Sequence, residues 1–228
     1  VIFMEMESNK QHEIDRFLSN DYIDKELLLN IFRDYIVEGW NDKGKFDFLI
    51  SVWSLNRSLP DYKKIKILFV DTPRLFTLEG LKNDTIDRDQ FMAREILNSL
   101  VSKVDKRNAL FIVGSKHVCK TLESAGSILT KHLKNKSYTL FTHCPRVDNF
   151  RIIHERIRHG IFDFAFYKNN DKPVAFELMN SPFGKEPFDG LYLDGTGTYQ
   201  DNFDGYIFFG SLDTEPNDEL LLEMYDDK

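Results

Sequence analysis

The chain has 228 residues, of which 42% are hydrophobic and 29% charged, a balance typical of a globular domain. Its formal net charge of −7 argues against broad nucleic-acid binding, which needs a basic face to displace phosphate counterions. No apolar run approaches the roughly 18 residues of a membrane span, so none is expected. The only two cysteines, Cys119 and Cys144, exclude a disulfide framework and favour a reducing, cytoplasmic compartment.

The chain begins at Val1 inside an apolar run and has no initiator methionine, which indicates a fragment or a processed form. A signal peptide upstream of Val1 would not be visible here. The length favours one generous domain. We expect a single α/β domain over 1–228, with a βαβ core over 1–147 and a C-terminal hairpin, loop and last strand over 148–228.

Short runs of branched and aromatic residues alternate with stretches in which apolar residues recur every three or four positions. The runs predict strands at 1–4, 65–70, 110–113, 138–141 and 206–209. The periodic stretches predict helices at 11–18, 24–39, 46–59, 118–133 and from 84–89 to about 104. Asp24 is the expected N-cap of the second helix, and Pro60 ends the third. This alternation predicts a mainly parallel sheet flanked by helices.

The pattern changes after about residue 148. Two mainly apolar runs, 162–167 and 173–178, flank the polar segment 168–172, which predicts a β-hairpin. Residues 181–200 contain several glycines and predict an irregular loop. The C-terminal part is therefore expected to be less regular than the βαβ core.

The stretch 109–118 carries the first candidate site. Residues 110–113 predict a fully buried strand, Gly114 allows a sharp turn, and His117 follows at the carboxyl end of that strand. Ligands bind at this edge of open α/β sheets. His117 is therefore either a ligand-binding, basic or metal-donating residue, or simply a helix cap or a solvent-facing side chain.

Other polar residues follow other predicted strands: Glu5, Asp71 with Arg74, and His143. The carboxyl ends of parallel strands share one edge, so these residues are expected near His117. A carboxylate and a histidine in one crevice can activate water. The alternative is that each residue caps a neighbouring helix.

A charged group begins the helix after Asp84. Asp87 and Asp89 suit the positive end of the helix dipole and can be simple capping residues. Arg88 is a cation at the same end, which is unfavourable unless it meets an anion. That anion is expected to be Glu5, Asp71, or a carboxylate or phosphate of a substrate.

Two weaker clusters remain. His117 and Cys119 could approach His143 and Cys144, a ligand set that zinc accepts, but the spacing fits no standard zinc motif and inert, buried cysteines are the simpler interpretation.

The second cluster is the basic segment 151–159, which includes Arg158. It either binds an anion such as a carboxylate, a phosphate or a haem propionate, or forms a solvated helix face paired with Glu155.

Several runs resemble a known superfamily. Residues 3–11, Phe-Met-Glu-Met-Glu-Ser-Asn-Lys-Gln, resemble the ChaN-like haem-binding uptake proteins, as do 14–18 and 26–28. Residues 88–93 and 114–117 are similar to the Arg-Asp-x-x-Met-Ala and Gly-x-x-His motifs of the wider superfamily, which also contains erythromycin esterase-like, TraB-like and Tiki-like proteins. The resemblance covers roughly residues 1–140.

The resemblance implies an α/β sheet with its site at the strand ends. By position, Glu5 matches a family glutamate, His117 matches the histidine of Gly-x-x-His, and Arg88 and Asp89 match the helix-start pair. A first family motif, Gly-Glu-x-His or Gly-x-x-His, would lie upstream of Val1, and without it a catalytically silent scaffold is a further alternative.

The resemblance implies an esterase-like or metal-assisted hydrolase, in which Glu5 and His117 activate water while Arg88 and Asp89 position the substrate. The alternative is a non-catalytic protein that binds haem or another anionic ligand. In either case the ligand is expected to be a small anionic or ester compound, and a divalent metal or haem is the compatible cofactor. The expected ligand-binding residues are Asp71, Arg74, His143 and Arg158.

Overall fold

The computed structural model describes residues 1–32, 43–73, 86–101, 108–143, 146–148, 151–155, 157–189 and 197–210. The chain divides into two compact units, with the boundary between Ile112 and Val113. Both units combine helices with strands, so the predicted α/β class is confirmed. The single domain over 1–228 stays a prediction.

The first unit contains a parallel sheet of three strands, β1 (Ile2–Glu7), β2 (Ile67–Asp71) and β3 (Leu110–Ile112), in the order β2-β1-β3. Its helices are α1 (Gln11–Ser19), α2 (Lys25–Phe32), α3 (Lys43–Ser58) and α5 (Arg88–Val101), with short 3-10 turns at Ser8–Lys10 and Asp61–Lys63. The strands and helices predicted over the described part of residues 1–112 are therefore confirmed, with ends moved by a few residues.

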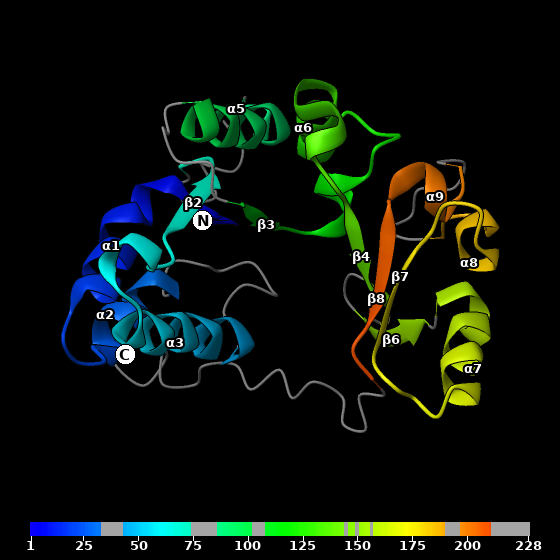
Figure 1. The fold of residues 1–228 in the computed structure, drawn as a ribbon, viewed down its shortest axis with the longest axis horizontal. Coiled ribbons are helices and arrows are strands. Elements are labelled where there is room, and N and C mark those ends of the chain that lie inside the picture. Colours follow the sequence, from blue (N-terminus) through cyan, green and yellow to red (C-terminus); the bar gives the residue numbers. More distant parts are fainter. Residues whose placement is uncertain are drawn as a thin grey trace. The chain divides into compact units, whose positions relative to one another are not determined.

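The sheet order places helices on both of its faces. The chain moves from β1 to β2 in one direction and from β2 to β3 in the other, so right-handed crossovers put the two connections on opposite sides. Figure 1 shows α5 on the side of the sheet away from α3. Met4 and Met6 of β1 pack into the core with the helices α1, α2 and α3. Phe3 and Glu5 alternate with them along the strand and point to the α5 side.

Local sequence explains where these elements start and stop. The Leu27 N–H donates to Asp24 Oδ1 at 3.0 Å, which confirms Asp24 as a helix cap, and Pro60 follows the end of α3. Full burial of the strand over 110–113 is wrong, because Leu110 is 51% exposed. β3 lies at the edge of this three-stranded sheet, and an edge strand has a neighbour on one side only.

The second unit contains a mixed sheet in the order β4-β8-β7. β8 (Gly205–Phe208) pairs in parallel with β4 (Leu140–Thr142) and antiparallel with β7 (Val174–Glu177), and lies between them in Figure 1. β5 (Arg146–Asp148) and β6 (Arg151–Glu155) form a separate antiparallel pair. The helices are α6 (Ala125–Leu133), α7 (Ile161–Lys168), α8 (Pro182–Lys185) and α9 (Tyr199–Asn202), with 3-10 turns at Ser115–Val118, Lys134–Lys136 and Ile157–Gly160.

Three predictions for this unit are wrong. The loop predicted over 181–200 contains the short helix α8, which Ser181 caps by accepting the Gly184 N–H, and the start of α9. The first strand of the hairpin predicted over 162–178 is the helix α7 instead. Its phenylalanines recur at every second residue, a spacing that is also typical of a strand. Only Phe162 and Phe166 are buried, and residues four apart lie on the same face of a helix.

The helix predicted over 118–133 begins only at Ala125. Ser124 and Ser127 exchange side-chain to backbone hydrogen bonds in a capping box, which fixes this start. Gly126 then lets the first turn of α6 approach the preceding 3-10 turn, because a Cβ there would lie 2.6 Å from Val118 Cα.

An aromatic core fills the second unit. Tyr206 of β8 is fully buried, and its ring centroid lies 5.4 to 6.0 Å from the rings of Phe141, Phe162, Phe166 and Phe176. Within the described ranges, no helix has the length and apolarity needed to cross a bilayer.

Candidate functional site

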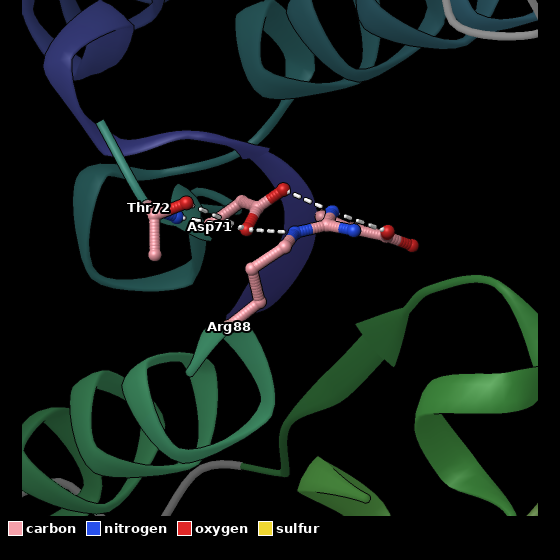
Figure 2. Close-up of polar contacts among 4 residues, drawn as sticks. Asp71, Thr72 and Arg88 are labelled. Carbon is pink, nitrogen blue, oxygen red and sulfur yellow. Dashed lines mark hydrogen bonds and ion pairs between the residues drawn. The ribbon is translucent and has the colours of Figure 1, made fainter. Parts of the chain in front are cut away.

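Arg88 is the centre of a buried charged cluster in the first unit. Its Nε donates to Asp71 Oδ1 at 3.0 Å, and its Nη2 donates to Glu5 Oε1 at 2.8 Å and also to Asp71 Oδ2. Figure 2 shows the Arg88 side chain extending from the start of α5 to meet Asp71 edge-on. Asp71 Oδ1 also accepts a hydrogen bond from the Thr72 N–H at 2.8 Å, so the backbone helps to fix the orientation of this carboxylate. We refer to Glu5, Asp71 and Arg88 as the carboxylate–arginine cluster.

Local structure brings these three side chains together. Glu5 lies in β1, Asp71 ends β2, and Arg88 is the first residue of α5, which follows β2 along the chain. Asp87 caps α5 by accepting the Gln90 N–H at 3.1 Å, as the sequence suggested. The expectation that Arg88 needs an anion is confirmed, and both of the expected protein anions are present.

Burial makes this cluster electrostatically strong. Glu5 is 5% exposed and Asp71 is 6% exposed, while the Arg88 side chain retains 27% of its surface. Burial by itself would lower the pKa of Arg88, but the hydrogen bonds and charge of Asp71, followed by those of Glu5, raise that pKa above its ordinary value. Arg88 therefore stays a cation, and its bidentate contact fixes its orientation.

The other predicted residues of this unit contribute less. Asp89 lies half-buried in the first turn of α5, next to the cluster in sequence, where its charge suits the helix dipole. Arg74 lies outside the described residues.

His117 is placed in the 3-10 turn Ser115–Val118 of the second unit. Its backbone N–H donates to the carbonyl of Gly114 at 2.9 Å, and the residue is half-buried. Because Glu5 and His117 belong to different units, the approach of the two side chains stays a prediction.

His143 lies between two hydrogen-bonding side chains of the second unit, Tyr206 and Asp163. Its Nδ1 is 2.7 Å from the hydroxyl of Tyr206, and its Nε2 is 3.4 Å from Asp163 Oδ1. The rings of Phe166 and Phe208 pack edge-on against the imidazole with centroids 5.1 and 5.2 Å away. Both nitrogens face protein groups, so this arrangement does not favour the expected ligand-binding role.

The sequence reasoning missed Tyr206 and Asp163 as partners of His143. Tyr206 belongs to an apolar run of the sequence that predicts a strand, but a buried tyrosine hydroxyl needs a hydrogen-bond partner. Asp163 lies on α7, where a strand was predicted.

Burial of His143 predicts a loss of stability in acid. Burial lowers the pKa of His143 below 6.5, and the charge of Asp163 opposes this only in part. As the pH falls below 6.5, His143 is therefore protonated in the unfolded chain before it is protonated in the folded protein. The free energy of unfolding decreases over this range, down to the lower pKa of the folded state. We expect His143→Gln to reduce this acid-dependent loss, measured by urea unfolding between pH 7.5 and 5.5.

His132→Gln is the control for that experiment. His132 is an exposed residue of α6 whose ring Nδ1 lies 2.8 Å from the Ile128 carbonyl oxygen, so its replacement removes a histidine without disturbing the buried one, and the acid-dependent loss should remain. If His143→Gln retains the full acid-dependent loss of the parent protein, the burial of His143 is not its cause.

Arg158, the predicted anion-binding residue, already has an anionic partner. Its Nε and Nη2 each donate to Glu186 Oε2 at 3.2 Å. Its backbone N–H donates to Asp189, which also accepts the hydroxyl of the buried Tyr199 at 2.7 Å. This network holds Arg158 in a left-handed backbone conformation, with φ of 50°. This arrangement does not favour the expected anion-binding role of Arg158.

The described residues do not assemble the zinc site considered from sequence. Cys119 is fully buried, and burial raises the pKa of its thiol to about 12, so the thiolate that a metal needs is disfavoured. No three His, Cys, Asp or Glu side chains are grouped as a metal site within the described ranges. Cys144 lies outside them.

Comparisons of the chain with protein-family models, with curated proteins and with solved structures find no match. The superfamily resemblance therefore rests on the motifs in the sequence.

Proposed function

We propose that this chain is an esterase-like hydrolase with its site at the carboxyl ends of β1 and β2. The observation that supports this most is the buried carboxylate–arginine cluster at that edge of the parallel sheet. In doubly wound sheets, ligands bind beyond the carboxyl ends of the strands, where the strand order reverses. In the order β2-β1-β3 that reversal falls beside β1, the strand that carries Glu5.

In the proposed reaction Glu5 acts as general base. Its carboxylate accepts a proton from water while the water oxygen attacks the carbonyl carbon of an ester. The bond between that carbon and the alkoxy oxygen then breaks, and the leaving alcohol takes the proton from Glu5. Arg88 holds Glu5 in position, and Asp89 supports the first turn of α5. His117 enters through the resemblance, as a second group that orients the water.

Replacing Glu5 with glutamine tests this proposal. The amide can still accept the Arg88 hydrogen bond but is no base, so we expect hydrolysis to fall by about a hundredfold or more. The measurement is kcat/KM on a panel of p-nitrophenyl esters. A thermal melt of the same sample establishes that the variant is folded.

Glu95→Gln is the matched control, because it makes the same chemical change at a half-buried position of α5 whose side chain retains 40% of its surface. It should leave ester hydrolysis unchanged. Hydrolysis that survives both Glu5→Gln and His117→Ala would contradict the proposed site, and a protein that hydrolyses no ester would contradict the proposed function. Metal analysis of the untreated protein, with chelator-treated enzyme as comparison, shows whether a divalent metal assists the reaction.

Haem binding without catalysis is the alternative, and the described residues support it less. His143 has protein groups at both ring nitrogens, and Arg158 is paired with Glu186, so neither fits an iron or a propionate as placed. Titration with haem distinguishes the two functions. A Soret band that is lost in His117→Ala would favour binding over hydrolysis.

A further inference from the structure

The guanidinium of Arg88 has one nitrogen that the cluster leaves available. Nε and Nη2 are used by Asp71 and Glu5, whereas Nη1 has no hydrogen-bond partner among the described residues. The side chain is 27% exposed, so it is not sealed from solvent. Nη1 carries two N–H donors, and their direction is set by the bidentate contact with Asp71. Arg88 therefore presents a fixed pair of donors.

The formal charges of the three side chains in the carboxylate–arginine cluster sum to −1. Glu5 and Asp71 contribute two formal negative charges against the single positive charge of Arg88, and both carboxylates are buried. Charges interact strongly where water is excluded. An anion that accepted a hydrogen bond from Nη1 would approach a cluster in which the two carboxylates outweigh the positive charge of Arg88. A neutral acceptor would meet the same donors without that repulsion.

From this we infer that Arg88 Nη1 binds the carbonyl oxygen of an uncharged acyl group, and that the site discriminates against anions. The inference rests on the proposed hydrolysis and replaces the anionic ligand expected from sequence. Proton transfer to Glu5 keeps the net charge of the site constant during the proposed reaction. As water attacks a neutral ester, Glu5 takes the proton and loses its negative charge, while the carbonyl oxygen acquires a negative charge. The net charge of cluster and substrate stays at −1, and Nη1 donates to the developing oxyanion.

Acetamide and acetate are matched probes of this inference. They have nearly the same shape, and both offer an oxygen to Nη1, but only acetate is an anion at pH 7.5. Binding is followed through the side-chain N–H resonance of Arg88 in ¹⁵N-labelled protein, assigned with Arg88→Lys. We expect acetamide to shift this resonance at concentrations about tenfold lower than acetate, corresponding to 1.4 kcal/mol.

Asp71→Asn supplies the sharper test. It removes one negative charge while retaining an acceptor for Arg88, so acetate should gain affinity and acetamide should not. Asp47→Asn, an exposed position on α3, is the control and should change neither. Equal or tighter binding of acetate to the parent protein, or no response to either probe, would overturn the inference. Selective acetamide binding without hydrolysis of any ester would instead support the inference and contradict the proposed function.

Discussion

Replacing Arg88 with methionine is expected to lower the free energy of unfolding by about 3–5 kcal/mol. The substitution preserves much of the aliphatic volume but removes the guanidinium that lies between the buried carboxylates of Glu5 and Asp71. Both tryptophans of the chain, Trp40 and Trp53, belong to the first unit, so urea unfolding followed by tryptophan fluorescence reports on the unit that contains the cluster.

Arg94→Met is the matched control for this prediction. Arg94 lies on the same helix, and its ion pair with Glu95 is exposed, so its loss should change the stability by at most about 1 kcal/mol. Arg88→Lys should lie between the two, because an ammonium keeps the charge but loses the bidentate geometry. Equal effects of the Arg88 and Arg94 substitutions would show that the cluster is not a buried one.

The role of Arg88 within the protein was predictable because the reason is local. A cation at a helix N-terminus is unfavourable, so its partner had to be an anion, and the predicted strand ends supplied Glu5 and Asp71. The caps at Asp24 and Asp87 were predictable on the same grounds, since each depends on backbone N–H groups a few residues away. The βαβ alternation of the first unit likewise follows from patterns within single segments.

The remaining features depend on contacts between distant segments. His143 and Tyr206 are 63 residues apart, and Arg158 and Glu186 are 28 apart, so no local spacing in the sequence predicts either contact. The exposure of Leu110 depends on where β3 lies in the sheet, which its own apolar residues do not specify. The sequence could therefore nominate His143 and Arg158 as functional residues, but it could not show that each already has protein partners.

The aromatic segment 161–168 fits two periods, and the two make different predictions. In a strand, Phe162, Phe164 and Phe166 would share one face, whereas in a helix Phe164 points away from the other two. The structure shows the helical arrangement, with Phe166 3% exposed and Phe164 59% exposed. Local pattern alone could not choose, because the choice depends on the aromatic core against which the helix packs.

This difference makes Phe166→Ala and Phe164→Ala a matched pair. The Phe166 ring stacks on Phe208 at 4.0 Å between centroids and also contacts Phe183 and His143. Its truncation should lower the free energy of unfolding by about 3–5 kcal/mol, measured by circular dichroism during urea unfolding.

Phe164 has a cation–π contact with Lys168 on the solvent side, so its truncation should cost less than about 1 kcal/mol. Tryptophan fluorescence of the same samples reports on the first unit, since the second contains no tryptophan. Similar losses for the two variants would place both rings on one buried face and contradict the helix. A large loss for Phe166 alone is the result that a helix packed on an aromatic core requires, because only one of the two rings then reaches Phe208.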